Sequence, residues 1–269
     1  MLIPVPAMLA DRATIPVANP APVRDAATVV LLRNGAEGLQ TYLLRRQKSM
    51  KFAPGMYVFP GGGVDPDDQR IDWVGASAAE WAQRFGCAEP IARSLVCAAA
   101  RETFEESGIL LAGPDAHSVV ADTSGDDWVA DRISLENKEF SFAAFLERRK
   151  LVLRADLLAA WAHWITPKFE PRRFDTRFFV AVVPAGQRVG DIPGEADEGV
   201  WMGVRAILDG VHDGSIAMLP PTVKTVEGIM ELTDAGEAIT VAPTRRILPI
   251  EPELVLIDGK PFLRAELGE

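Results

Sequence analysis

A nine-residue segment, Arg101–Ile109, constrains this chain more than any other part of its sequence. It reads R-E-T-F-E-E-S-G-I and places carboxylates at Glu102, Glu105 and Glu106, followed by Gly108. In a helix each residue advances about 100° around the axis, so the three carboxylates share one face. Gly108 suits the left-handed conformation that often ends a helix. The segment therefore predicts the last turns of a helix with negative charge gathered on one side.

Two interpretations of this acidic face are open. Like charges at this spacing destabilise an exposed helix by a few tenths of a kcal/mol per pair, and charge runs are usually solvated. A hard divalent cation would instead make the cluster a binding site, because Mg²⁺ prefers carboxylate oxygens and keeps water and substrate phosphates as its other ligands. The opposite side of the helix carries an apolar stripe at Cys97, Ala100 and Phe104, which predicts burial of that side.

A glycine-rich segment upstream favours the metal-binding interpretation. Residues 59–65 read F-P-G-G-G-V-D, and glycine allows close backbone approach and dihedral angles that other residues avoid. Together, F-P-G-G-x-x-D and R-E-x-x-E-E-x-G resemble the two halves of the Nudix box, the signature of the Nudix hydrolases. Arg101–Ile109 matches the second half at every fixed position.

The first half of the box departs from the family pattern. The common spacing places a glutamate eight residues before the box arginine, and this chain has Arg93 at that position. The glycines also lie too far upstream, so we expect an insertion inside the box at residues 66–88. A split box resembles the Nudix subgroup of the peroxisomal coenzyme A diphosphatase, Nudix motif 19. The resemblance extends over segments 26–33, 54–59, 72–73, 164–167 and 172–179.

The resemblance implies a fold, a reaction and a cofactor. The fold is an α/β/α sandwich with a mixed sheet. The reaction is hydrolysis of a nucleoside diphosphate linked to another moiety, with Mg²⁺ or Mn²⁺ as the cofactor. By resemblance, Glu105 and Glu106 are metal ligands, and Glu102 is a ligand or lies close to one.

The resemblance also assigns roles to residues around the carboxylates. Gly61 and Gly62 are implied to shape the turn that faces the helix, and their carbonyl groups are candidates to reach the metal. Arg101 is implied to orient a glutamate, and its alternative is a surface ion pair of small energetic value.

A further carboxylate is expected from a distant loop, because many Nudix enzymes recruit one as a base or an extra ligand. The candidates are Glu195, Asp197 and Glu198, in the sequence G-E-A-D-E-G-V-W. We favour Glu198, which lies three residues before Trp201 in an expected strand. The alternative is a solvated acidic loop.

Basic residues before the glycine turn are candidates to bind substrate phosphates. Arg46 and Lys51 occupy the basic positions of a motif found in coenzyme A Nudix enzymes, whereas Gln47 replaces its small hydroxyl residue. Arg173 lies in a second basic cluster with Arg172 and Arg177, and it could bind phosphate or have a structural role.

Composition excludes several classes of partner. The net charge of −10 makes a nucleic acid an improbable partner, since such binding usually needs a basic surface. No apolar run is long enough to span a bilayer, so no membrane association is expected. Two cysteines suggest no disulfide framework, and a reducing, cytoplasmic location fits. The expected partner is a small nucleotide substrate, and a homodimer stays open.

Periodicity and turn residues predict the order of elements. Expected strands cover 27–33, 39–45, 56–59, 163–166, 177–183 and 199–203, and expected helices cover 78–85, the stretch from Pro90 to the box glutamates, and 222–232. Two or three helices are expected within 126–161. We expect a flexible N-terminal arm at 1–25, a Nudix domain at 26–240 with inserts at 66–88 and 113–161, and a C-terminal extension at 241–269 with a hairpin.

Three functional hypotheses follow from the sequence. The leading one is cleavage of coenzyme A or acyl-coenzyme A to 3′,5′-ADP and 4′-phosphopantetheine or its acyl ester. The second is cleavage of ADP-ribose or a nucleotide sugar. The third is a Nudix domain that senses a nucleotide without cleaving it, and the presence of Glu102, Glu105 and Glu106 argues for an enzyme instead, because such sensors often lose box glutamates.

Overall fold

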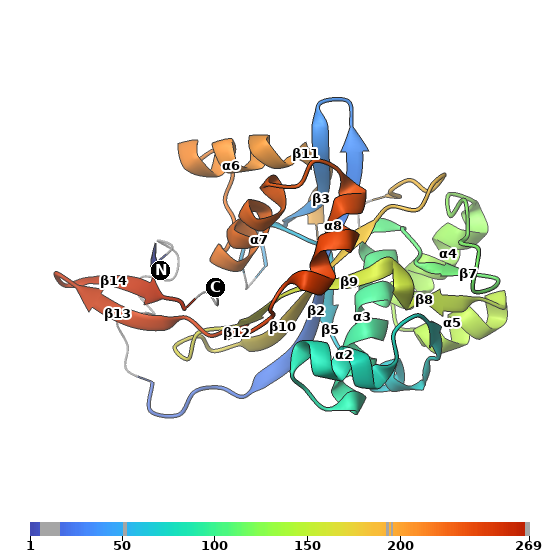
Figure 1. Ribbon diagram of the computed structural model, residues 1–269, viewed down its shortest axis with the longest axis horizontal. Helices are drawn as coiled ribbons and strands as arrows, with labels where there is room; N and C mark the ends of the chain where they lie inside the picture. Colours follow the sequence, from blue (N-terminus) through green and yellow to red (C-terminus); the bar gives the residue numbers. More distant parts are fainter. Residues whose placement is uncertain (6–16, 51–52, 192–193, 195, 267–269) are drawn as a thin grey trace.

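A mixed β-sheet with helices on both faces forms the centre of the molecule, as the sequence predicts (Figure 1). The computed structural model describes residues 1–5, 17–50, 53–191, 194 and 196–266. The strand order of the central sheet is β11-β3-β2-β10-β9-β12, with β4 beside β3 and β5 beside β2. The bounds are β2 (Val23–Gly35), β3 (Gly38–Arg46), β4 (Tyr57–Val58), β5 (Gly61–Gly63), β9 (Leu158–Ile165), β10 (Arg173–Val182), β11 (Ala196–Gly203) and β12 (Pro249–Ile250).

Strand β2 lies in the middle of the sheet and is buried on both faces. Successive side chains of a strand point to opposite faces, so Ala27 and Leu31 enter one core while Val30 and Leu32 enter the other. This double burial explains its continuous apolar sequence. The neighbouring strand β10 runs parallel to β2, and β9 runs antiparallel to β10.

Two helices cover the first face of the sheet, α2 (Ala78–Phe85) and α3 (Glu89–Ser107). Ser77 begins α2 by accepting a hydrogen bond from a backbone N–H of the first turn. Gly86 and Gly108 end the two helices with φ angles of 62° and 75°, in the left-handed region that glycine adopts at little cost. Both helices therefore have the bounds that their capping residues predict.

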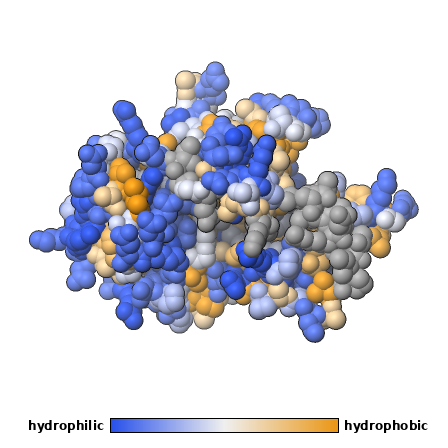
Figure 2. Space-filling view, turned by 180° about the vertical axis from the view of Figure 1, so that it is seen from behind, coloured by the Kyte–Doolittle hydropathy of each residue, from blue (hydrophilic) through white to orange (hydrophobic). Residues whose placement is uncertain are grey.

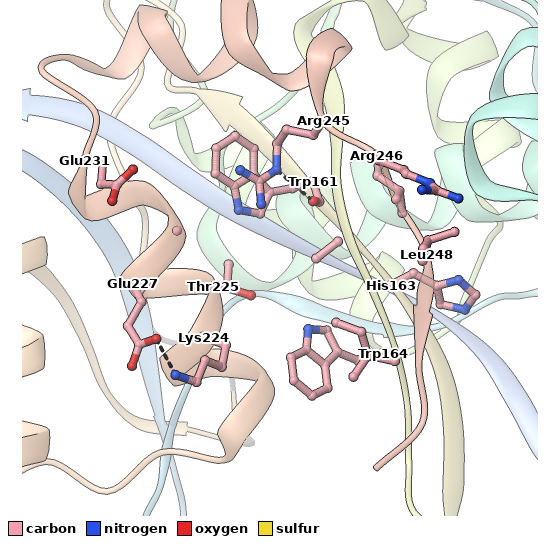
Figure 3. Close-up of a pocket in the computed structure, with 14 residues that line it drawn as sticks. Trp161, His163, Trp164, Lys224, Thr225, Glu227, Glu231, Arg245, Arg246 and Leu248 are labelled. Atoms are coloured by element: carbon pink, nitrogen blue, oxygen red, sulfur yellow. Dashed lines mark hydrogen bonds and ion pairs between the residues drawn. The ribbon is translucent and has the colours of Figure 1, made fainter. Parts of the chain in front are cut away.

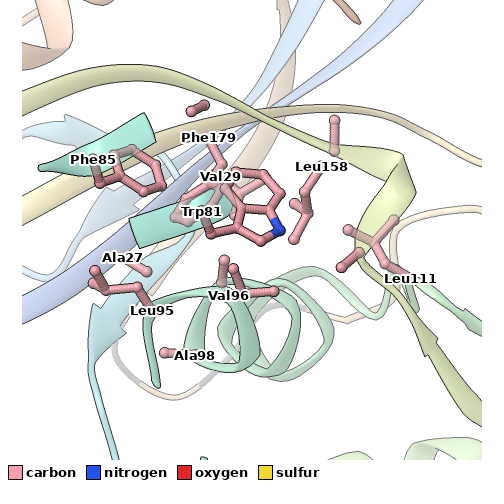
Figure 4. Packing of buried hydrophobic residues seen from close by; sticks show 14 of the residues in the cluster. Ala27, Val29, Trp81, Phe85, Leu95, Val96, Ala98, Leu111, Leu158 and Phe179 are labelled. Carbon is pink, nitrogen blue, oxygen red and sulfur yellow. The ribbon is translucent and has the colours of Figure 1, made fainter. Parts of the chain in front are cut away.

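Aromatic and branched side chains join these helices to the sheet. Figure 4 shows Trp81 and Phe85 of α2 beside Phe179 of β10, with Leu95 and Val96 of α3 in the same cluster. The ring centroids of Trp81 and Phe179 are 5.5 Å apart, a spacing typical of favourable aromatic contacts. This core fixes the position of α3, which carries the box glutamates.

Three helices cover the opposite face: α6 (Val204–Asp213), α7 (Pro220–Met230) and α8 (Ala235–Val241). Their buried side chains pack on Val30 and Leu32 of β2. Only α7 was expected from the sequence. The sandwich is therefore covered by helices on both faces of its sheet.

A third core lies on the far side of α3. The apolar stripe of Cys97, Ala100 and Phe104 packs there, as its helical spacing predicts. Its partners come from α4 (Asp126–Glu136), α5 (Phe142–Arg149) and a small sheet of β6 (Trp73–Val74), β8 (Val152–Arg154) and β7 (Ala112–Gly113). Helix α3 is therefore held between the central sheet and the inserted helices.

The expectation of helices through residue 161 was wrong at its end. A short 3₁₀ turn, Ala155–Leu157, leads directly into β9, so residues 158–161 belong to the central sheet. The sequence L-A-A-W-A-H-W-I is apolar at most positions, because β9 packs on both faces, and it shows neither helical nor strand periodicity.

The two ends of the chain meet in a separate small sheet. The hairpin β13 (Glu253–Ile257) and β14 (Lys260–Arg264) occupies the C-terminal extension, and β1 (Leu2–Pro4) pairs with β14. Residues 6–16 of the expected N-terminal arm lie outside the described residues. A second short turn, η3 (Ala242–Thr244), connects α8 toward β12.

The surface agrees with the acidic composition. Figure 2 shows mostly hydrophilic side chains on the end of the molecule that carries α4 and α5, with small hydrophobic patches between them. Within the described part of the chain, no helix is long and apolar enough to cross a membrane.

Candidate active site

The two halves of the split box meet in the structure. Strand β5 contains the glycine turn and lies beside β2, and the backbone N–H of Gly61 donates to Glu106 Oε2 at 2.7 Å. The carbonyl of Gly63 accepts from Arg101 Nη2 at 2.8 Å. Gly62 lies so close to α3 that a Cβ at this position would be 2.6 Å from Glu102 Cδ. The juxtaposition expected from a split box is therefore present.

Arg101 is the centre of this junction. Its side chain is only 6% exposed, and its Nη1 donates to Glu102 Oε1 at 2.7 Å and to Glu105 Oε2 at 3.2 Å. On its other side, Nε and Nη2 each donate at 3.2 Å to one carboxylate oxygen of Asp68. The burial of Arg101 excludes the alternative of a surface ion pair and favours a positioning role.

The inserted segment of the box supplies Asp68. It lies in the short 3₁₀ helix η1 (Pro66–Arg70) and accepts a hydrogen bond from the backbone N–H of Asp65. Arg93 anchors the same segment, because its Nη2 donates to the carbonyl of Ile71 at 3.0 Å and to Asp72 at 2.9 Å. The basic residue that departs from the family pattern thus holds the insertion against α3.

Burial and charge alter the acidity of the cluster. Burial raises the pKa of Glu105 to about 7, the nearby Arg101 lowers it, and the charge of Glu102 raises it again. Burial likewise raises the pKa of Glu102, against the attraction of Arg101. Without a bound cation, Glu105 therefore changes protonation near neutral pH.

The carboxylates of Glu102, Glu105 and Glu106 are chemically suited to bind a hard divalent cation. Carboxylate oxygens are the ligands that Mg²⁺ prefers, and the cost of burying Glu102 and Glu105 would fall beside a positive ion. Their side chains point to Arg101, whereas Glu106 points to Gly61. Among the described residues, no three acidic, histidine or cysteine side chains are already grouped to hold a metal ion.

The favoured remote carboxylate is held by two side chains outside the box. Glu198 lies in β11, where its Oε2 is 3.0 Å from Arg45 Nη1 and accepts a hydrogen bond from Tyr57 at 3.0 Å. Asp197 pairs with Nε of the same arginine at 2.7 Å. Glu195, the third candidate, lies outside the described residues. The contacts of Glu198 do not include the glutamates of α3, so its role in catalysis stays a prediction.

The three predicted phosphate-binding residues have different surroundings. Arg46 is the last residue of β3 and is partly buried, and Lys51 lies outside the described residues. Arg173 is buried, and its guanidinium donates to the carbonyls of Thr166 and Ala21 and pairs with Glu251. These contacts favour the structural alternative for Arg173.

Two pockets lie near the two halves of the box. One, of about 370 Å³, lies between η1, the inserted helices and α3, and Arg101, Glu105 and Lys138 are in its wall. A second, of about 310 Å³, is mainly apolar and lies between β9, β10 and the start of α7.

The third pocket is separate from the box. Figure 3 shows Arg245 over the ring of Trp161, and Lys224 paired with Glu227 on α7. None of the fourteen residues that line it belongs to the glycine turn or to α3. Its lining combines both signs of charge and indicates no particular ligand.

Asp68 is the main residue of the junction that the sequence did not reveal. The pattern D-P-D-D at 65–68 resembles a helix-capping sequence and could have located η1. Its pairing with Arg101 joins residues 33 positions apart, and no local pattern indicates that contact.

Comparison with known proteins agrees with the geometry of the box. A family model described as the NUDT19 Nudix domain matches residues 79–229, which is more than half of the chain. The chain belongs to this Nudix family. The matched range contains α3 with all three box glutamates, and Nudix hydrolases generally use divalent metal ions.

Individual relatives of the NUDT19 Nudix family are distant. A Xenopus laevis protein named acyl-coenzyme A diphosphatase NUDT19 is 26% identical over 224 residues, which cover 70% of this chain and 59% of that protein. The human protein of the same name is 29% identical over 186 residues, which cover 54% of this chain and 48% of that one. This chain thus spans about half to three fifths of the length of these curated relatives.

A solved structure supports the Nudix fold directly. The crystal structure of a NUDIX hydrolase from Alicyclobacillus acidocaldarius is 29% identical and superposes with a TM-score of 0.67. The superposition covers 82% of this chain and 96% of that protein. The sandwich and its helices are therefore those of a Nudix domain.

Proposed function

We propose that this chain hydrolyses the diphosphate of coenzyme A or acyl-coenzyme A with Mg²⁺ as the cofactor. The products would be 3′,5′-ADP and 4′-phosphopantetheine or its acyl ester. The observation that carries the proposal is the junction of the glycine turn with α3, where Gly61 contacts Glu106 and Arg101 contacts Glu102 and Glu105. The name of the Xenopus laevis relative supports the choice of substrate.

The reaction requires water to attack one phosphorus of the diphosphate. A new P–O bond forms, the bond from that phosphorus to the bridging oxygen breaks, and two phosphate monoesters leave with one proton released. Because the reacting oxygens are anionic, positioning and neutralisation of charge dominate catalysis. A bound divalent cation supplies that positive charge and lowers the pKa of water.

Residues of α3 would bind the cation and hold its ligands in position. Glu102, Glu105 and Glu106 would hold the cation, which requires Glu106 to turn from Gly61 toward the other two carboxylates. Arg101 would keep Glu102 and Glu105 on one side of α3. Beside the cation Glu105 would be held in its charged form, because a nearby positive charge lowers the pKa of a carboxyl.

Two further groups would act on the substrate. Glu198 would approach as a base or an extra ligand once its pairing with Arg45 and Tyr57 is released. Arg46 and Lys51, which precede the glycines in the sequence, would bind the 3′-phosphate of coenzyme A. A charge-assisted hydrogen bond to that phosphate is worth about 1.5–3 kcal/mol, or roughly 10- to 150-fold in kcat/KM.

The test is hydrolysis of coenzyme A by the purified protein, with chromatographic separation of 3′,5′-ADP from 4′-phosphopantetheine. Activity should disappear with EDTA and return with Mg²⁺ or Mn²⁺. Glu105→Gln and Glu106→Gln should each lower kcat about 100-fold or more, equivalent to about 2.7 kcal/mol. Glu147→Gln, at an exposed glutamate of α5, is the matched control and should leave kcat unchanged.

A second comparison tests the choice of substrate. Coenzyme A should be cleaved with higher kcat/KM than 3′-dephospho-coenzyme A, and Arg46→Ala should reduce that difference. Faster cleavage of ADP-ribose or a nucleotide sugar would overturn the coenzyme A assignment. Nucleotide binding without turnover in any divalent metal would indicate a sensor, and full turnover in EDTA would overturn the metal-dependent mechanism.

A further inference from the structure

We propose that Asp68, which the insertion inside the box supplies, is a positioning residue for the reaction. It holds Arg101 so that Glu102 and Glu105 each present one oxygen to the divalent cation. The inference rests on the proposed function, because it gives a task to a residue beside that site. Asp68 lies in η1, and its side chain is only 2% exposed. Burial of a carboxylate is costly unless the group is paired, so the contacts of Asp68 define its role.

Hydrogen bonds fix the Asp68 carboxylate from two sides. Within η1, its Oδ2 accepts from the backbone N–H of Asp65 at 2.7 Å, and the backbone N–H of Asp68 donates to the Asp65 carbonyl at 3.1 Å. Toward α3, Oδ1 accepts from Arg101 Nε and Oδ2 accepts from Arg101 Nη2, both at 3.2 Å. Two side-by-side contacts with a planar guanidinium set its orientation as well as its position.

Arg101 uses all five of its N–H groups. Nε and one N–H of Nη2 bind Asp68, and the second N–H of Nη2 binds the carbonyl of Gly63 at 2.8 Å. The two N–H groups of Nη1 bind Oε1 of Glu102 and Oε2 of Glu105. Within the described residues, the second oxygen of each glutamate makes no hydrogen bond. While Asp68 holds the guanidinium, these two oxygens can bind a cation.

The turn that contains Asp68 is anchored from both sides. Arg93 occupies the position where the family pattern has a glutamate, and its Nη2 donates to the carbonyl of Ile71 at 3.0 Å, just after η1. Lys138, which follows α4, lies 3.4 Å from Asp65, just before η1. Helix α3 and the inserted helices therefore both hold this turn, and Asp68 has a fixed place beside Arg101.

The balance of charge favours a role beyond stability. Three largely buried carboxylates surround one guanidinium, which leaves a formal charge of −2 when all four groups are ionised. Asp65, whose carboxylate is 3.9 Å from the same guanidinium, is more exposed and pairs with Lys138. Buried charge that lacks a partner destabilises the folded state. A divalent cation on Glu102 and Glu105 would neutralise this excess.

Binding of Mn²⁺, measured by calorimetry in the absence of substrate, tests the inference. Asp68→Asn keeps the size of the side chain and removes its charge, so Arg101 should move toward Glu102 and Glu105 and compete with the cation. The Kd for Mn²⁺ should rise about 10- to 100-fold, the usual effect of losing a residue that supports metal ligands. Asp67→Asn, in the same turn and 52% exposed, is the matched control and should leave this Kd unchanged.

Kinetics and a double-mutant cycle test whether Asp68 acts through Arg101. At saturating Mn²⁺, Asp68→Asn should lower kcat for coenzyme A by about tenfold or more and leave KM unchanged, because the contact acts on the ligands and not on the substrate. In an Arg101→Gln background, Asp68→Asn should have no further effect on the Kd for Mn²⁺. Effects of the two substitutions that multiply would overturn positioning through Arg101.

The outcomes separate this inference from the proposed function. An unchanged Kd for Mn²⁺ in Asp68→Asn overturns the inference, whereas hydrolysis of coenzyme A by the wild type would still support the reaction. Loss of Mn²⁺ affinity in Asp68→Asn, in a protein that cleaves no coenzyme A ester, supports the inference and overturns the reaction. A wild type that binds no Mn²⁺ overturns both.

A second variant decides the question if Asp68→Asn does not fold. Asp68→Glu keeps the charge and lengthens the side chain by one methylene, which displaces the carboxylate from its place beside Arg101. Because metal ligands must be held to within about 0.5 Å, the Kd for Mn²⁺ should still rise. A wild-type Kd in a folded Asp68→Glu variant overturns the inference.

Discussion

The raised pKa of Glu105 predicts that this glutamate makes folding stability depend on pH. In the folded protein its pKa is about 7, against an ordinary value of 4.5. Between these values the unfolded chain loses the proton while the folded chain keeps it, so the free energy of unfolding falls as pH rises. At 1.36 kcal/mol per pH unit the fall amounts to about 3 kcal/mol, and it is complete above about pH 7. The side chain is 13% exposed, so solvent screening removes little of this effect.

Urea denaturation in EDTA, at intervals from pH 4.5 to pH 8, measures the effect. Other carboxylates also titrate in this range, so the quantity of interest is the difference between wild type and Glu105→Gln. That difference should change by about 3 kcal/mol in favour of the variant as pH rises. Glu147→Gln controls for the loss of one negative charge and should show no such trend. A difference between wild type and Glu105→Gln that is constant with pH would refute the reasoning.

Three further substitutions test other contacts of the site. Gly62→Ala should displace the carboxylate of Glu102, because the new Cβ would lie 2.6 Å from Glu102 Cδ. The variant should lower kcat at least tenfold and lose about 1–3 kcal/mol of folding stability through overpacking. An unchanged kcat would show that Glu102 has no fixed position in catalysis. Glu198→Gln should reduce kcat more than it raises KM in steady-state kinetics, and an unaffected kcat would exclude Glu198 as the remote carboxylate. Arg173→Lys should lower the stability measured by thermal unfolding by about 1.5–3 kcal/mol and leave KM unchanged, because the Arg173 guanidinium binds two carbonyls and Glu251. A raised KM for coenzyme A with unaltered stability would instead support the predicted role of Arg173 in substrate binding.

Local sequence signals predicted the elements that position the box. Ser77, Gly86 and Gly108 give the bounds of α2 and α3, because capping depends on residues adjacent in the chain. The glycines of β5 and the glutamates of α3 could be matched to a known pattern, and the structure brings them together.

Local sequence patterns could not predict contacts between residues that are far apart in the chain. Asp68 reaches Arg101 across an insertion, and its sequence indicates only a helix cap. Helices α6 and α8 were missed, since α6 has no capping side chain at Gly203 and α8 is only seven residues long. Arg173 stood in a basic cluster in the sequence, but its partners Ala21 and Glu251 come from remote segments that only the fold brings near.

The parallel pairing of β2 with β10 has a consequence for how the chain folds. Val23 pairs with Arg173, 150 residues later, so the central strand stays incomplete until most of the chain exists. Synthesis proceeds at roughly 5–20 residues per second, so about 8–30 s pass between synthesis of β2 and synthesis of the strand that pairs with it. Non-local pairing of this kind slows folding. During that interval β2 can pair with other chains, so protein synthesis at lower temperature or with chaperones should raise the yield of folded protein.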